Sequence, residues 1–282
     1  MSTAMKAVAN VLTPTRATGA VAGGRRVFGA VLGAVFAAAV WATLAQHASM
    51  DAMGGMPMAG GWTLSAGWLR PCGWRAAHAF SAFAGMWGAM TVTMMLPVLA
   101  PALWRYRQRV VALRGARAAW LVAVAGAGYF SVWMAVGALV FAAGTALAAA
   151  AVRLPALAAA MPFAAGAVVL GAGVLQCSGW KMRRLACCRH APGDGSALRE
   201  RAGAAVAWRH GVRAALRCGA CCGNLMAVSL AAGMMDLRVM AVVTVAIAVE
   251  RLAPAGERVA RIVGAVAIGA GAAMIAWAAA LA

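Results

Sequence analysis

Seven long apolar stretches run through the chain, and they restrict its fold more than any other feature. About 20 apolar residues are enough for a helix to cross the hydrocarbon core of a membrane. Because no water satisfies backbone groups there, only helices and closed barrels are stable, and the alternation typical of a barrel strand is absent. We therefore predict an all-α, polytopic membrane protein. The predicted spans cover residues 27–45, 77–103, 119–146, 155–176, 214–235, 238–253 and 259–282.

The composition supports this prediction, since 11% of the residues are charged, against about 25% in soluble domains. We expect a basic N-terminal segment at 1–26 and a single transmembrane domain at 27–282. The stretch at 238–253 is short for a hydrocarbon core of ~30 Å, so we expect it to lie partly within the bundle. The first stretch is followed by no small-x-small cleavage site, which favours an uncleaved anchor over a signal peptide.

The net charge of +19 is distributed over alternate connections between the spans. Cytoplasmic loops of membrane proteins carry an excess of lysine and arginine. The cation-rich regions are 1–26, the loop after the second span, the basic, cysteine-containing loop at 177–213 and the loop after the sixth span. We therefore place these regions and the N-terminus in the cytoplasm. A nucleic-acid partner is rejected because the cations do not form one patch.

The predicted outer loop at 46–75 is rich in methionine and histidine. Thioethers select copper(I) over magnesium, calcium or manganese, and they avoid the disulfide chemistry that consumes thiols outside the cytoplasm. We predict that this flexible loop wraps one copper(I) ion, the alternative being an apolar loop that lies on the bilayer. The donors in the loop and beside it are His47, Met50, Asp51, Met53, Met56, Met58, Cys72 and His78.

A stripe of soft donors follows one face of the second span. His78, Met86, Met90 and Met94 are separated by eight, four and four residues, and such positions lie on roughly one face of a helix. The stripe is interpreted in two ways. It passes a soft ion through the membrane from thioether to thioether, or it fills the core, for which methionine is well suited.

Six of the seven cysteines fall at or near predicted cytoplasmic loops, where thiols stay reduced. Cys218, Cys221 and Cys222 open the fifth span as C-x-x-C-C, and positions i, i+3 and i+4 share a helix face. We predict that the three thiols converge on a metal ion or act as a redox group, the alternative being small apolar side chains in a helix. Further donors in the loop at 177–213 are Cys187, Cys188 and His190.

Two acidic residues flank the sixth span. Asp236 is expected to cap a turn, and Glu250 is expected to pair with Arg251 or a loop arginine. Two G-x-x-x-G pairs, in 29–33 and 219–223, predict close helix approach or reflect a glycine-rich composition. Phosphate-loop, H-E-x-x-H and G-x-S-x-G motifs are absent from the sequence. We therefore expect no enzymatic activity.

Together these motifs resemble an uncharacterised bacterial family of predicted metal-binding integral membrane proteins, some members of which are labelled copper chaperones. The resemblance covers roughly residues 80–255 and implies a multi-pass protein of a bacterial inner membrane with a metal-binding role. Three positions depart from the family pattern, because Arg184 stands for a cysteine, Ala214 for a histidine and Gly223 for a tryptophan. The matching segments are Met86–Pro97, Gln176–Arg189, Cys218–Met226, Gly233–Met235 and Glu250–Pro254.

The leading hypothesis is a membrane protein that handles a soft metal ion, with copper(I) as the preferred ion, in delivery, transport or as a chaperone. Its partners would be the lipid bilayer and a metal-receiving membrane or periplasmic protein. One alternative is a thiol–disulfide electron carrier, which needs a thiol reachable from the outer face, and Cys72 is the candidate. The other alternative is a non-catalytic assembly subunit of a membrane complex.

Overall fold

The computed structural model describes residues 14–65, 68, 76–110, 115–189, 203–233 and 236–281. Within these ranges the regular structure is helical apart from one hairpin, which confirms the predicted all-α class. The hairpin consists of β1 (Gly55–Pro57) and β2 (Thr63–Ser65). The helices are α2 (Pro14–Met53), α3 (Ala76–Val110), α4 (Gly115–Arg153), α5 (Pro155–Cys177), α6 (Gly179–Arg189), α8 (Ala204–Ala231), α9 (Leu237–Leu252) and α10 (Gly256–Leu281).

Six of the seven predicted spans are matched by helices that are long and apolar enough to cross a membrane. These segments are Gly24–Met50, Ala76–Val110, Gly115–Arg153, Pro155–Cys177, Ala204–Ala231 and Gly256–Leu281. The exception is α9, which matches the short sixth stretch. Its 16 residues extend over about 24 Å, less than the ~30 Å of a hydrocarbon core.

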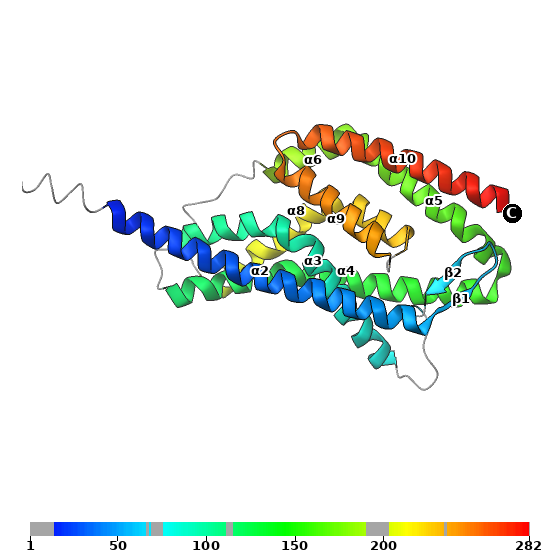
Figure 1. Ribbon diagram of the computed structural model, residues 1–282, viewed down its shortest axis with the longest axis horizontal. Coiled ribbons are helices and arrows are strands. Elements are labelled where there is room, and N and C mark those ends of the chain that lie inside the picture. Colours follow the sequence, from blue (N-terminus) through cyan, green and yellow to red (C-terminus); the bar gives the residue numbers. More distant parts are fainter. Residues whose placement is uncertain are drawn as a thin grey trace, which may run out of the picture.

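Two hydrogen bonds between distant segments mark the two ends of the bundle. At what we call the basic end, Arg107 Nη1 of α3 donates to the carbonyl oxygen of Gly24 in α2 over 3.0 Å. At the opposite end, which we call the hairpin end, Trp62 Nε1 donates to the carbonyl oxygen of Ala158 in α5 over 2.9 Å. The C-terminus lies near the hairpin, and α10 runs beside α5 (Figure 1).

The segment predicted as a flexible outer loop has regular structure. Helix α2 continues to Met53, so the prediction of a loop is wrong for residues 46–53. The apolar run ends earlier, but alanine, glutamine and methionine favour helix whether or not the helix remains apolar. The hairpin follows, with Met56 of β1 opposite Leu64 of β2. Its connection contains Gly60 and Gly61 at φ values of 91° and 74°, which other residues rarely adopt.

The predicted basic loop at 177–213 is also partly helical. It contains α6, and α8 begins at Ala204, ahead of the predicted start at residue 214. Arginine and alanine are good helix formers, so a change from apolar to basic residues does not end a helix. Lys181 and Leu185 of α6 are fully buried, which shows that this helix packs into the bundle.

Glycines permit close helix contacts, but not at the pairs singled out in the sequence. A Cβ atom at Gly166 of α5 would lie 3.1 Å from the carbonyl oxygen of Gly271 in α10. Nothing lies within 4 Å of such an atom at the four expected positions, so the predicted close approach through them is wrong. These positions are Gly29, Gly33, Gly219 and Gly223.

Candidate metal centre

Two cysteine thiols meet inside the bundle on α8. Cys218 and Cys222 are about one helical turn apart, so their side chains lie on the same face. Their Sγ atoms are 3.6 Å apart, and the Cys222 thiol donates to the carbonyl oxygen of Cys218 over 3.0 Å. Both residues belong to the main hydrophobic core. Two of the three thiols in the C-x-x-C-C motif therefore converge as predicted.

Groups from α9 and α4 surround this thiol pair. Arg251, near the end of α9, places Nη1 3.6 Å from the Sγ atom of Cys218. Tyr129 of α4 interacts electrostatically with both thiols. The buried Tyr129 side chain also interacts with the side chain of Trp133 on the same helix.

The third thiol of the motif points elsewhere. Cys221 packs against Leu185 of α6 and Ala260 of α10 in a separate small cluster. Successive residues of an α-helix are rotated by about 100°, so Cys221 and Cys222 face different neighbours. The expectation that all three thiols share one ion therefore differs from the observed arrangement, in which Cys221 contributes to helix packing.

A buried polar network lies beside the thiol pair at the basic end. Lys181 Nζ and Glu250 Oε2 are 3.0 Å apart, and each side chain is 1% exposed. Gln176 Nε2 donates to the other carboxylate oxygen of Glu250, and Asn224 Nδ2 donates to Gln176 Oε1. Lys181 Nζ also donates to the carbonyl oxygen of Cys221. The network joins α5, α6, α8 and α9, and so fixes the end of α9 that carries Arg251.

Sequence reasoning missed this network. The sequence predicts that Glu250 pairs with Arg251 or a loop arginine. In the structure Glu250 interacts with Arg251, and it also forms an ion pair with Lys181, a partner that was not predicted. The sequence does contain an indication of the network, because polar and charged residues lie within or next to apolar segments. At membrane depth such side chains are energetically unfavourable unless they are paired. The prediction for Asp236 is confirmed, because its carboxylate caps α9 by accepting from the amides of Arg238 (2.8 Å) and Val239 (3.3 Å).

The methionine stripe of α3 is buried, and two of its members line a small cavity of about 20 Å³. The cavity brings together one imidazole and three thioethers from α2, α3 and α9. Met94 lies in the main core, whereas His78 is exposed near the start of α3 and does not join the stripe. The lining residues of this methionine cavity are Thr43, His47, Met86, Met90, Asp236, Leu237 and Met240.

The other donors of the predicted outer loop do not gather around one ion. Met50 lies on α2 and packs against the core. Met56 is exposed on β1, and Met58 follows it in the hairpin connection. Of the described donors in 46–65, only His47 lines the methionine cavity. Outside the described residues lie the side chains of Asp51 and Met53 and the whole of Cys72.

The donors predicted in the basic loop are separate from the thiol pair. Cys187 is exposed on α6, while the side chain of Cys188 and the whole of His190 lie outside the described residues. Within the described ranges, no three His, Cys, Asp or Glu side chains form a group that could hold a metal ion. A four-ligand structural zinc site is therefore not formed in that part of the chain, and the soft donors that remain are the thiol pair and the thioethers.

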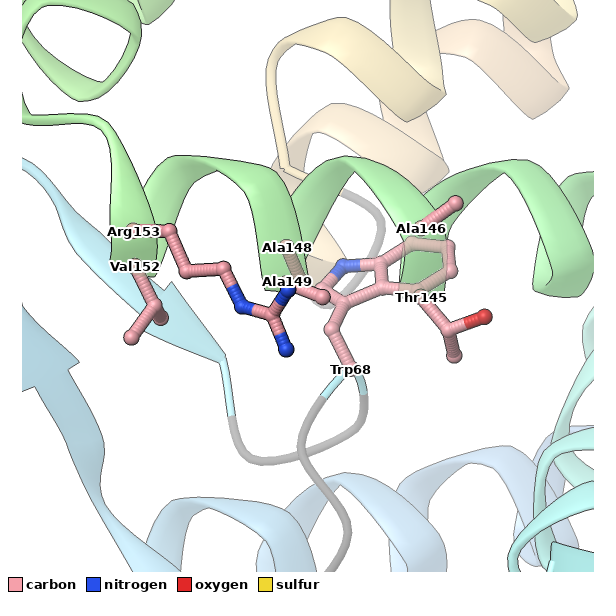
Figure 2. Close-up of a pocket in the computed structure, with 7 residues that line it drawn as sticks. All are labelled: Trp68, Thr145, Ala146, Ala148, Ala149, Val152 and Arg153. Atoms are coloured by element: carbon pink, nitrogen blue, oxygen red, sulfur yellow. The ribbon is translucent and has the colours of Figure 1, made fainter.

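A larger cavity, of about 530 Å³, opens on α4 near the hairpin end (Figure 2). Figure 2 shows the Trp68 ring lying across the helix, with the Arg153 side chain extended beside it. The cavity contains no sulfur or imidazole group, so it does not suit a soft metal ion. Its lining residues are Trp68, Thr145, Ala146, Ala148, Ala149, Val152 and Arg153.

The sequence profile of the family described as PpoB2, copper chaperone, matches residues 84–274, which is more than half of the chain. The chain belongs to the PpoB2 copper chaperone family. The part matched by the PpoB2 family contains the methionines of α3, the thiol pair of α8 and the Arg251 end of α9. No curated protein and no solved structure gives a significant match. Membership in the PpoB2 family gives the chain a copper-related function in general.

Proposed function

We propose that the protein binds copper(I) between Cys218 and Cys222 inside a membrane bundle and delivers it to an acceptor protein. The observation that carries this proposal is a buried pair of thiols 3.6 Å apart in a chain of a copper chaperone family. Soft thiolate ligands select copper(I) over magnesium, calcium or manganese. With metal–thiolate bonds of about 2.3 Å, one ion can contact both sulfur atoms without movement of the backbone.

The methionine cavity is proposed as a second, weaker site nearer the hairpin end. Its soft donors are an imidazole and three neutral thioethers, from His47, Met86, Met90 and Met240. Asp236 also lines the cavity, and its carboxylate caps α9. Met94 and Met226 belong to the same core as Cys218 and Cys222. These soft side chains support a route for the ion between the cavity and the thiol pair.

The orientation of the route follows from charge. Under the positive-inside rule, the basic end lies in the cytoplasm of a bacterium and the hairpin end outside the inner membrane. The thiol pair then lies toward the reducing side, where thiols persist, and the acceptor is a membrane or periplasmic protein reached from the methionine cavity. Binding and release of the ion need no covalent step on a substrate, so the proposed role is not enzymatic.

Metal analysis of the protein purified in detergent from copper-supplemented cells tests the thiol pair. We expect near-stoichiometric copper in the wild type and its loss in the double variant Cys218→Ser/Cys222→Ser. The matched control is Cys221→Ser, which removes a thiol of the same motif that packs against Leu185 and Ala260 and should retain the copper. Absence of copper from the wild type, or loss only in Cys221→Ser, would contradict the proposal.

The methionine cavity is tested with Met86→Leu/Met90→Leu. Leucine has nearly the volume of methionine, and such swaps usually cost below about 1.5 kcal/mol, so the protein should fold while losing two thioethers. In an anaerobic copper(I) titration we expect the strong binding step to remain and a weaker step to disappear. Met95→Leu is the matched control, because Met95 is buried beside the stripe but does not line the cavity. An unchanged weak step in the double variant would rule out the second site.

The contact between the Cys218 and Cys222 thiols also favours a second candidate function, a thiol–disulfide electron carrier. Trapping of thiols in cells, with and without reductant, distinguishes the two functions. An electron carrier would show a fraction of these cysteines in disulfides, whereas a copper site would keep both reduced. An assembly subunit would instead copurify with its complex in mild detergent.

A further inference from the structure

The distance between the two thiols determines the geometry of an ion bound between them. The Sγ atoms of Cys218 and Cys222 are 3.6 Å apart. With metal–thiolate bonds of about 2.3 Å, this distance gives a sulfur–metal–sulfur angle of about 100°. A linear arrangement would need the two sulfur atoms about 4.6 Å apart, which is twice the bond length. An ion at the observed spacing therefore lies to one side of the line between the sulfur atoms and is open to a third ligand.

A third sulfur atom follows on the same helix. Met226 is the single methionine of α8, and it lies four residues after Cys222, as Cys222 lies four residues after Cys218. Each step of four residues rotates by about 40° around the helix, so the three side chains share roughly one face. Cys218, Cys222 and Met226 are buried in the same core, with exposed fractions of 2%, 2% and 5%.

Helix geometry also directs the Met226 side chain toward the thiol pair. Side chains of an α-helix point toward its N-terminus, and long side chains such as methionine adopt the rotamers that extend them over the preceding turn. For Met226 the preceding turn is the one that carries Cys222. The thioether is therefore directed toward the thiol pair rather than away from it.

The other groups beside the thiol pair are not soft donors. From the neighbouring helices, Arg251 of α9 and Tyr129 of α4 interact with the thiols. A guanidinium has no acceptor atom, and oxygen ligands suit harder ions than copper(I). Cys221 packs against α6 and α10 instead. Of these residues and Met226, only Met226 offers a donor that suits copper(I).

We propose that the Met226 thioether is the third ligand of the ion, so that two thiolates and one thioether from one face of α8 hold copper(I). This inference rests on the proposed binding of copper(I) by Cys218 and Cys222, and it adds a ligand to that site. Met226 shares its core with Met94 of α3. The third ligand is therefore also the first thioether of the route toward the methionine cavity.

X-ray absorption at the copper edge tests the inference on the full-length protein in detergent, loaded with one equivalent of copper(I). We expect three sulfur ligands in the wild type and two in Met226→Leu, a substitution that nearly conserves volume and should fold. In protein labelled with selenomethionine, the copper ion should have one selenium neighbour, which Met226→Leu removes. Removing a group that merely supports a ligand typically costs 10–100-fold in metal affinity. Loss of the ligand itself should therefore lower copper(I) affinity by at least about 10-fold.

The matched control is Met134→Leu on α4. The Met134 sulfur atom faces α3, since it lies 3.6 Å from the position of a Cβ atom at Gly88. This variant should keep three ligands, the selenium neighbour and the wild-type affinity. Met226→Ile is a second variant without a thioether, which keeps the test usable if Met226→Leu does not fold.

The outcomes separate this inference from the proposed function. If the wild type binds no copper(I), or if Cys218→Ser/Cys222→Ser binds it equally well, both are overturned. If the thiol pair binds copper(I) with two sulfur ligands and no selenium neighbour, only the role of Met226 is overturned. A selenium neighbour that persists in Met226→Leu also overturns that role, because another methionine then supplies the ligand.

Discussion

Replacing Glu250 by leucine should lower the free energy of unfolding by about 3–5 kcal/mol, the usual cost of removing one partner of a buried ion pair. The Lys181 ammonium would remain at a site where it is 1% exposed. Gln176 Nε2 would lose its carboxylate acceptor at the same time. Thermal unfolding in detergent, followed by tryptophan fluorescence, measures the effect. Copper(I) affinity should also fall, because the network no longer fixes the end of α9.

The compensating variant for this prediction is Lys181→Met/Glu250→Leu. Replacing both members of a buried ion pair by apolar side chains is often nearly neutral, so the second substitution should recover most of the loss. The coupling between the two changes, from a double-mutant cycle, measures their interaction. A loss below about 1 kcal/mol in Glu250→Leu, as in exposed pairs, would show that water reaches this network.

The correct predictions from the sequence concern features that depend on a single helix. The apolar stretches predicted the long helices, because length and hydropathy alone satisfy the requirements of a span. The i, i+4 spacing predicted that Cys218 and Cys222 lie together, since this depends only on helix geometry. The cap at Asp236 is likewise local, because the amides that donate to its carboxylate are two and three residues away.

Predictions from the sequence were less accurate for features that depend on how neighbouring helices pack. The C-x-x-C-C spacing allows Cys221 to join the pair, but the packing of α6 and α10 against α8 gives this thiol its own apolar surroundings. Helical periodicity shows which residues share a face of one helix. It does not show which other helix packs against that face. The same limit explains the four glycines that were expected at helix contacts and lie in open positions instead.

Contacts between distant segments were not predictable from spacing at all. Gln176 and Glu250 are 74 residues apart and bond to each other in the core. The sequence predicts that His47 acts with the methionines that follow it, whereas in the structure it lines a cavity with Met86 and Met90 of α3. In both cases the sequence shows an unusual polar or sulfur-binding residue. Its partner on another helix can be predicted only when it is known which helices are neighbours and at what height along the bundle each residue lies.

Helix α9 connects the two proposed copper sites. Asp236 and Met240 at its start line the methionine cavity, and Arg251 at its end contacts the thiol pair. The Asp236 carboxylate caps the start of α9, and the ion pair of Glu250 with Lys181 joins the end of α9 to α6. A change at either site therefore acts on the same rigid element.

Gly211→Ala should be the most damaging small substitution in α8, because it acts where α8 meets α4. A Cβ atom at Gly211 would overlap the carbonyl oxygen of Ala125 and lie 2.8 Å from the amide nitrogen of Tyr129. Both obstacles are backbone atoms of a helix, which cannot rotate away as a side chain does. We expect a loss of stability at or above the upper end of the range of about 1–3 kcal/mol for overpacking. Copper(I) affinity should fall too, because Tyr129 would move away from the thiol pair.

Gly219→Ala provides the matched control on the same helix. No atom lies within 4 Å of a Cβ at Gly219, so the added methyl group meets no obstacle. Alanine is a better helix former than glycine by about 0.8–1.0 kcal/mol, so this variant should be as stable as the wild type or more stable. Thermal unfolding and copper(I) titration of both variants give the comparison. If the two substitutions have equal effects, the close contact of α4 with α8 does not position the thiol pair, since helix propensity alone would then account for both.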